Sequence, residues 1–206
     1  MLKVFGFPKS RSARVLWMLE ELGAEYHYVK VDLGAGAGQS ADYTAINPFG
    51  KVPTLCDDDF CLTESAAILT YLGDRFPAAE LIPPPGSLDY ARYLQWAFFV
   101  LSELEQPLWT LAKHKFALPK DYRIPEISRT ALWEFRRAAA VLAKGINEHG
   151  FLIGDSFSAA DLLAAHTLSW AQAFEVSLDD HRLEEYATQH LARPAYLRAR
   201  ERELNL

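Results

Sequence analysis

The chain has 206 residues, of which 50% are hydrophobic, and its formal net charge is −6. This length supports a sizeable core, in one domain or in two small ones. The acidic balance and the lack of a long Lys/Arg run exclude nucleic acid and an anionic membrane as main partners. No stretch of about 18 apolar residues occurs and the first residues lack a signal-peptide core, so we expect a cytoplasmic protein without membrane contact.

The first 76 residues combine strand and helix patterns. The apolar positions of the first helix recur at helical spacing, and Gly23 ends it. The predicted elements are a strand over 2–7, a helix over 12–22, a strand over 25–33, a loop with one irregular helical turn over 34–46, strands over 52–56 and 60–63, and a helix over 64–76. A βαβ unit followed by a hairpin and a helix predicts a mixed α/β sheet of the thioredoxin type.

Residues 77–87, "PAAELIPPPGS", contain four prolines and one glycine, which is the strongest linker signal in the chain. Every periodic segment after it has the helical period, and no strand pattern is evident. We therefore expect a thioredoxin-like domain over 1–77, a linker over 78–87 and an all-α helical bundle over 88–206.

One helix start in the second domain carries agreeing local signals. Ser158 is a natural N-cap, and Asp161 three residues later completes a variant capping box. Phe157 and Leu162 flank this box as a hydrophobic staple. These residues predict a structural helix start near residue 159.

The two cysteines, Cys56 and Cys61, flank the acidic turn "DDDF". They could face each other across a hairpin. In a reducing cytoplasm, however, we expect two free, half-buried thiols.

Pro53 lies inside the predicted strand over 52–56. Proline cannot donate to a strand ladder and is normally found at an edge or a bulge, so its position leaves the backbone of Val52 unpaired. The stretches 10–14, 50–53 and 63–65 converge if the thioredoxin-type fold is correct. Two of them lie at helix N-termini, which favour anions, so we expect a ligand with anionic ends along an exposed backbone edge.

The chain resembles a cytosolic glutathione transferase over its whole length. The resemblance lies in the joint spacing of "KVFGFPKSRSARVLWMLEELG", "NPFGKVPTL", "LTESAAILTYL" and "FSAAD". It is nearest to the serine-type classes, in a theta- or phi-like bacterial group. It implies glutathione as co-substrate, a homodimer, and a detoxifying enzyme that conjugates glutathione to small hydrophobic electrophiles or reduces organic hydroperoxides.

The resemblance also implies residue roles in binding glutathione. Val52 offers its N–H and C=O to the cysteinyl backbone, while Pro53 holds the bend as a cis-proline. Ser65 takes the γ-glutamyl carboxylate and Glu64 the ammonium. Lys51 meets the glycyl carboxylate.

Gln39 is a further candidate for binding glutathione, in the region that matches the family least well. Ser10 matches the serine that activates the thiol and would donate a hydrogen bond to the thiolate. Ser12 is the alternative to Ser10 as the activating residue. As N-cap of the first helix, its hydroxyl would instead have a structural use.

The electrophile site is expected on the first long helix of the second domain. Its candidates are Phe99, Glu105, Trp109 and His114, and for each aromatic residue among them packing in the core or in a dimer is the competing interpretation. No His/Cys/Asp/Glu grouping has metal-ligand spacing, so we expect no metal. Phe49 is a candidate dimer contact, with packing under the Pro53 loop as the alternative. Other functions of the same scaffold are a non-catalytic binding or interaction protein and a glutathione-dependent isomerase or lyase.

Overall fold

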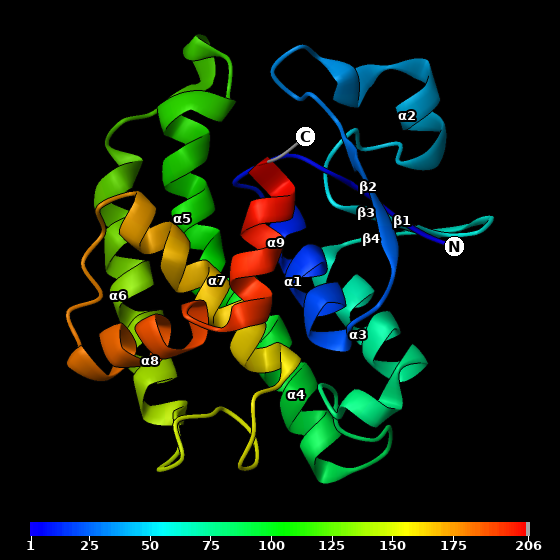
Figure 1. Ribbon diagram of the computed structural model, residues 1–206. Coiled ribbons are helices and arrows are strands. Elements are labelled where there is room, and N and C mark those ends of the chain that lie inside the picture. The colour runs from blue at the N-terminus through cyan, green and yellow to red at the C-terminus, as the bar shows by residue number, and fades with distance from the viewer. Residues whose placement is uncertain (205–206) are drawn as a thin grey trace. The chain divides into compact units, whose positions relative to one another are not determined.

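The computed structural model describes residues 1–204, which form two compact units (Figure 1). The first unit contains residues 1–82 together with the C-terminal segment from Ala192, and the second contains residues 83–191. The helical domain predicted from the sequence covers all of 88–206, and its boundaries stay a prediction. Within residues 1–204, no helix combines the length and the apolar character needed to cross a membrane.

The first unit is built on a four-stranded mixed sheet with the order β2-β1-β3-β4. β1 pairs parallel to β2 and antiparallel to β3, and β3 pairs antiparallel to β4. The strands are β1 (Leu2–Gly6), β2 (Tyr26–Lys30), β3 (Thr54–Asp57) and β4 (Phe60–Thr63). The expected thioredoxin-type arrangement is confirmed. β3 begins after Pro53 rather than at Val52, because proline supplies no N–H to the ladder.

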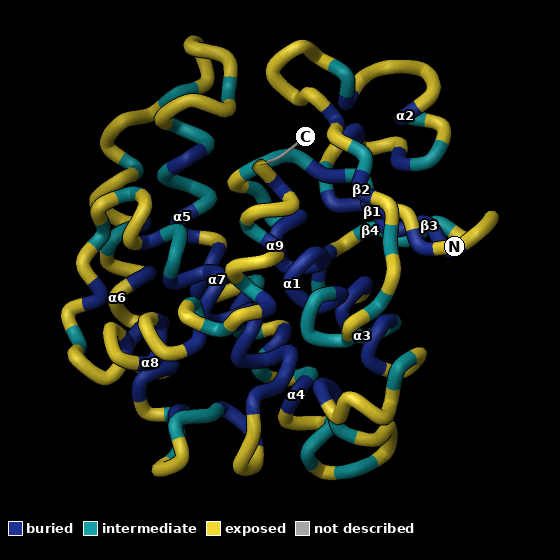
Figure 2. Tube along the Cα trace, viewed as in Figure 1, coloured by how far each residue is buried: buried dark blue, intermediate teal, exposed yellow. Residues whose placement is uncertain are grey.

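Helix α1 (Ser12–Leu22) is the centre of the first unit. Its residues from Ser12 to Leu19 are all buried, because α1 contacts both α3 (Ser65–Arg75) and the C-terminal helix α9 (Pro194–Leu204) (Figure 2). Gly23 ends α1 in the left-handed conformation, with a φ of 60°. This confirms the predicted helix and its stop.

Residues 34–46 contain more helix than the sequence predicts. A short 3₁₀ turn, η1 (Ala37–Gln39), precedes a six-residue helix, α2 (Ala41–Ile46). Ser40 caps α2 by accepting a hydrogen bond from the Tyr43 N–H at 3.3 Å. Fewer than two turns give almost no periodic signal, so the cap is the only local sign of this helix.

The prediction of two free thiols is wrong, because Cys56 and Cys61 form a disulfide. The two residues are directly opposite each other in the β3–β4 register, with their Cα atoms 4.1 Å apart. Direct opposition in an antiparallel pair brings two side chains on the same face into contact. Register, rather than the expected compartment, decides the state of these cysteines.

The second unit is entirely helical over residues 83–191. Two π-helical stretches, Val100–Leu104 and Lys113–Ala117, interrupt the first long helix that is expected in this part of the chain. The α-helices are α4 (Leu88–Phe99), α5 (Glu105–Ala112), α6 (Ile127–Gly145), α7 (Ala159–Ala173) and α8 (His181–Leu191). The all-helical character expected for this part of the chain is confirmed.

Helix α7 begins with the predicted capping box. The Ser158 N–H donates to Asp161 Oδ2 at 2.9 Å, and the Ser158 hydroxyl accepts the backbone N–H of Asp161. Asp161 Oδ1 also accepts the Leu152 N–H and the Tyr186 hydroxyl, each at 2.8 Å. Burial raises the pKa of Asp161 above its ordinary value, although these hydrogen bonds lower it. The box thus joins α7 to α8.

Candidate functional site

The sheet register brings three separate segments to one edge. Phe5 near the end of β1 lies opposite Thr54 at the start of β3, and Thr54 lies opposite Thr63 at the end of β4. The segment after β1, the segment before β3 and the segment after β4 therefore leave the sheet at the same edge. These segments carry Ser10, Val52 and Ser65 in turn, as the fold prediction expects.

The Val52–Pro53 peptide bond is cis, as expected. Within residues 1–204, the Val52 backbone forms no hydrogen bond to another backbone group, and its side chain is half-buried. An extended peptide ligand can therefore pair with Val52 in the manner of an added strand. Lys51 beside it is exposed and free to reach a ligand carboxylate.

Tyr43 and Asn47 hold the backbone just before Val52 through hydrogen bonds, and the sequence predicts no role for either residue. The Tyr43 hydroxyl and the Asn47 Nδ2 donate to the Lys51 carbonyl at 2.5 and 2.6 Å. Both side chains also reach Thr54 Oγ1 at 3.0 Å. Burial raises the pKa of Tyr43, which keeps it protonated and able to donate. Asn47 opens the "NPFGKVP" stretch, but only the fold shows what its amide contacts.

Gln39 lies against the same bend. Gly50 has a φ of 62°, and a Cβ added there would collide with the Gln39 amide and with the Gly38 carbonyl. Glycine is therefore required both by the backbone conformation and by the close approach of residues 38–39. The structure brings Gln39 next to Lys51, although its contact with a ligand stays a prediction.

The N-terminus of α3 forms another side of the site. Ser65 is the first residue of α3 and is buried, whereas Glu64 before it is exposed and has a φ of 66°. The Arg14 Nη1 donates to Ser65 Oγ at 3.2 Å, which leaves the Ser65 hydroxyl proton for a further acceptor. A helix N-terminus with a buried guanidinium nearby favours an anion such as a carboxylate.

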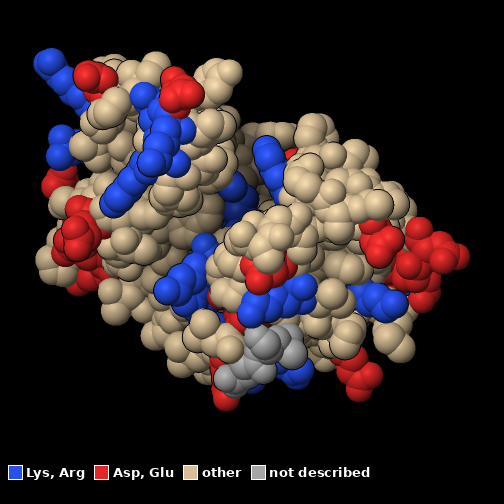
Figure 3. All heavy atoms as spheres, turned by 90° about the horizontal axis from the view of Figure 1, so that it is seen from above, with Lys and Arg blue, Asp and Glu red and all other residues tan. Residues whose placement is uncertain are grey.

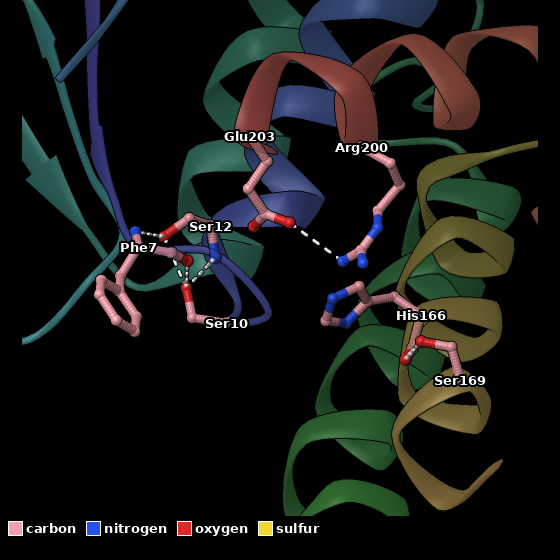
Figure 4. Close-up of polar contacts among 7 residues, drawn as sticks. All are labelled: Phe7, Ser10, Ser12, His166, Ser169, Arg200 and Glu203. Atoms are coloured by element: carbon pink, nitrogen blue, oxygen red, sulfur yellow. Dashed lines mark hydrogen bonds and ion pairs between the residues drawn. The ribbon is translucent and has the colours of Figure 1, made fainter. Parts of the chain in front are cut away.

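Ser10 and Ser12 share a hydrogen-bond network with Phe7 (Figure 4). Ser10 Oγ lies 2.6 Å from the Phe7 carbonyl and 2.9 Å from Ser12 Oγ, and it accepts the Ser12 N–H at 3.1 Å. Ser10 has a single hydroxyl proton, so it donates to only one acceptor at a time. Ser10 is half-buried, whereas Ser12 is 0% exposed.

The expectation that Ser12 is the N-cap of α1 is wrong. Arg11 occupies the N-cap position, and Ser12 is the first helical residue. The Ser12 hydroxyl accepts the Phe7 N–H at 3.3 Å, which fixes the loop rather than the helix end. In this structure the Ser12 hydroxyl therefore braces the loop, and Ser10 is the more exposed of the two serines.

The electrophile candidates lie in the second unit. Phe99 packs edge-to-face on Trp96 with ring centroids 5.4 Å apart, Glu105 is buried, and Trp109 is half-buried. His114 lines a cavity of about 540 Å³ whose apolar walls include Leu132 and Phe174. Its Nδ1 accepts the Ile124 N–H at 2.9 Å. Only His114 of the four candidates lines this cavity.

Charge is mixed on the surface. On the face drawn in Figure 3, Lys and Arg side chains lie over several parts of the surface, and the Asp and Glu side chains include a contiguous group at the right-hand edge. Over residues 1–204, no group of three or more His, Cys, Asp or Glu side chains could hold a metal ion.

The fold defines the class of this protein: a thioredoxin-like unit whose Val52 backbone is unpaired beside a cis-proline, joined in one chain to an all-helical unit. Models of the N-terminal and C-terminal domains of glutathione S-transferase match residues 1–74 and 106–193. The glutathione S-transferase GstA of Escherichia coli O157:H7 is 28% identical over 180 residues, which are 86% of each chain.

Solved structures agree with these matches. A glutathione transferase from Methylococcus capsulatus has a TM-score of 0.87 at 31% identity, covering 98% of each chain. A sphingomonad glutathione S-transferase complexed with glutathione has a TM-score of 0.85 at 32% identity, covering 99% of this chain and 100% of that one. The chain belongs to the glutathione S-transferase family.

Proposed function

We propose that this glutathione transferase activates the thiol of glutathione with the Ser10 hydroxyl and conjugates the thiolate to small hydrophobic electrophiles. The observation that carries the proposal is the meeting of the segments after β1, before β3 and after β4 at one sheet edge. Glutathione is a short peptide with a carboxylate at each end, so it matches an exposed backbone bordered by cationic and N-terminal groups.

Glutathione binding is proposed to follow the order of these groups. Val52 pairs with the cysteinyl backbone next to the cis Pro53. Ser65 donates to the γ-glutamyl carboxylate, supported by the hydrogen bond that its oxygen accepts from Arg14 at 3.2 Å. The α3 dipole adds to this attraction.

The outer ends of glutathione are proposed to meet exposed side chains. Glu64 faces the γ-glutamyl ammonium from the exposed position before α3, where its φ is 66°. Lys51 and Gln39 take the glycyl end. The contacts of Glu64 and Lys51 are surface ion pairs, which contribute about 1 kcal/mol or less each, and Gln39 adds only a neutral hydrogen bond. These side chains therefore orient the tripeptide more than they hold it.

Thiol activation requires a modest free energy. A free thiol has a pKa near 8.5, and lowering it by about two pH units requires about 2.7 kcal/mol. A hydrogen bond to a charged acceptor contributes about 1.5–3 kcal/mol, so one hydroxyl is sufficient. Ser10 already donates within a short network, and its proton has only to turn from the Phe7 carbonyl to the incoming sulfur.

The second unit is proposed to supply the electrophile site. Among Phe99, Glu105, Trp109 and His114, the cavity lining favours His114. The chemistry proposed there is conjugation, with reduction of organic hydroperoxides by the same thiolate. A serine at position 10, in place of a thiol, supports a serine-type enzyme, because a hydroxyl cannot form mixed disulfides.

We also propose a cytoplasmic homodimer. Phe49 is 76% exposed, so the alternative that it packs under the Pro53 loop is wrong. A large exposed aromatic residue on a loop is typical of an interface anchor. We also propose the domain limits that the sequence predicts, 1–77 and 88–206, with a linker over 78–87.

The decisive experiment is a titration of the glutathione thiolate in the bound state, followed by its ultraviolet absorbance. Ser10→Ala should raise the thiol pKa by about one to two pH units, the loss of one charged hydrogen bond. Ser12→Ala removes a brace of the same loop but keeps the proposed donor, so it should raise the thiol pKa less than Ser10→Ala does, and Ser102→Ala, at an exposed site on the second unit, is the matched control. If Ser10→Ala titrates like the wild type, the assignment of Ser10 is wrong. A panel of aryl halides and organic hydroperoxides then identifies the electrophile class.

A further inference from the structure

Tyr43 is a buried residue of α2 whose hydroxyl faces a backbone carbonyl. The residue is 5% exposed, and its ring lies against Phe5 of β1 with the ring centroids 5.9 Å apart. The hydroxyl donates to the Lys51 carbonyl at 2.5 Å. Because a helix of six residues is not stable by itself, these contacts help to hold α2 in place.

Three side chains and the Lys51 carbonyl form a closed hydrogen-bond network. Asn47 Oδ1 accepts the Phe49 N–H at 3.1 Å, which turns Nδ2 toward the carbonyl and Thr54. Nδ2 uses its two protons on the Lys51 carbonyl at 2.6 Å and on Thr54 Oγ1 at 3.0 Å. The Tyr43 hydroxyl gives its one proton to the Lys51 carbonyl, so the Thr54 hydroxyl donates to Tyr43 Oη at 3.0 Å. Each proton of the network thus has an acceptor, and the Lys51 carbonyl accepts two of them.

The network is buried together with Tyr43. Asn47 is 2% exposed and Thr54 is 0% exposed. A buried donor that loses its acceptor destabilises the fold by more than the hydrogen bond itself contributes. The Lys51 carbonyl therefore cannot turn away from Tyr43 and Asn47 without leaving buried donors unsatisfied, so its direction is fixed.

The direction of this carbonyl also sets the direction of the Val52 N–H. Both groups belong to the peptide unit between Lys51 and Val52, which is planar and trans, so the C=O and the N–H point in opposite directions. The N–H therefore points away from Tyr43 and Asn47, and no backbone group of residues 1–204 pairs with it. Two donors on the carbonyl also polarise the peptide unit, which makes its N–H a stronger donor.

We infer that Tyr43 is a positioning residue for glutathione binding: together with Asn47, it fixes the Lys51 carbonyl and so aims the Val52 N–H at the cysteinyl backbone of glutathione. This inference rests on the proposed role of Val52. It assigns to α2 a part in binding that needs no contact between Tyr43 and glutathione.

The test compares Tyr43→Phe with the matched control Tyr71→Phe. Tyr43→Phe keeps the ring and removes one donor to the Lys51 carbonyl, so the Kd for glutathione should rise about fivefold, as expected for one neutral hydrogen bond. The kcat at saturating glutathione and the pKa of the bound thiol should keep their wild-type values, because Ser10 lies in another segment. Tyr71→Phe removes a hydroxyl that donates to Asp57 at 2.6 Å, at the opposite end of β3, and should leave the Kd unchanged. Calorimetric titration measures the Kd, and urea unfolding measures the stability of each variant.

A double-mutant cycle with Lys51→Ala separates the backbone of Lys51 from its side chain. Because Tyr43 acts through the backbone, Tyr43→Phe should weaken glutathione binding by the same factor in the Lys51→Ala background as in the wild type. An effect that disappears in that background would overturn the inference, since Tyr43 would then act through the Lys51 ammonium. A Tyr43→Phe variant with the wild-type Kd would also overturn it, whether or not its stability falls. If the wild type itself does not bind glutathione, the proposed function fails instead, so the two failures are distinct.

Discussion

The Arg14 guanidinium donates to the Ser65 hydroxyl across 3.2 Å, and both residues are buried. This contact joins the first turn of α1 to the first residue of α3, fifty-one positions later in the chain. It therefore connects the helix that follows the Ser10 loop with the helix N-terminus proposed to hold the γ-glutamyl carboxylate. Arg14 thus supports two parts of the candidate site, the helix that follows the Ser10 loop and the N-terminus of α3.

Removing Arg14 should weaken glutathione binding more than catalysis. Arg14→Gln keeps a hydrogen-bond donor but loses the charge, and we expect the Kd for glutathione to rise about tenfold, because a charged hydrogen bond contributes about 1.5–3 kcal/mol. Isothermal titration calorimetry measures this change. Arg92→Gln, at an exposed pair with Asp89, is the control and should bind like the wild type. An unchanged Kd for Arg14→Gln would remove Arg14 from the binding site.

Gly6 should not tolerate a side chain. Gly6→Ala forces a Cβ to within 2.6 Å of Tyr28 and 2.7 Å of Ser12, and overpacking of this kind destabilises a fold by about 1–3 kcal/mol. Denaturant unfolding should show the lower midpoint. Gly34→Ala is the matched control, because its nearest neighbour would be the Asp32 side chain at 3.3 Å. Equal midpoints for the two variants would mean that the contacts of Gly6 with Tyr28 and Ser12 are loosely packed.

Local signals made part of this protein predictable. The helix over 12–22 combines apolar spacing with a glycine stop, and the Ser158–Asp161 box needs only residues three apart. The cis Val52–Pro53 bond followed from the resemblance, since nothing local distinguishes it from a trans bond. Each of these predictions depends on neighbours in sequence or on a motif of fixed spacing.

The remaining features depend on contacts between distant residues. The Cys56–Cys61 disulfide depends on the β3–β4 register. The expectation of free thiols in a reducing cytoplasm took no account of that register. Tyr43 contacts the Lys51 carbonyl only because a six-residue helix forms, and so short a helix has almost no periodicity. Glu203 looks like any other charge in an amphipathic tail until α9 packs on α1.

The disulfide should stabilise the first unit. It closes a loop with a sequence separation of five, for which chain entropy predicts a stabilisation of about 2 kcal/mol. A Cys56→Ser/Cys61→Ser double variant should unfold at correspondingly lower denaturant concentration than the oxidised wild type. Adding reductant should lower the wild-type midpoint without changing that of the variant. Titration of thiols in the denatured, unreduced protein should give none, and finding two would contradict the disulfide.

Glu203 should also leave a signature in the pH dependence of stability. Burial of its carboxyl raises its pKa in the folded protein, so the folded state binds its proton more tightly than the unfolded state does. The stability that this proton supplies is fully present below the unfolded pKa of about 4.3 and is lost as the pH rises through the higher folded pKa. The Glu203→Gln side chain cannot titrate. The free energy of unfolding of this variant should therefore rise relative to that of the wild type as the pH increases from acidic to neutral. Urea unfolding across this range measures the difference. Glu201→Gln, whose carboxylate is exposed, should run parallel to the wild type, and a parallel curve for Glu203→Gln as well would show that Glu203 has an ordinary pKa.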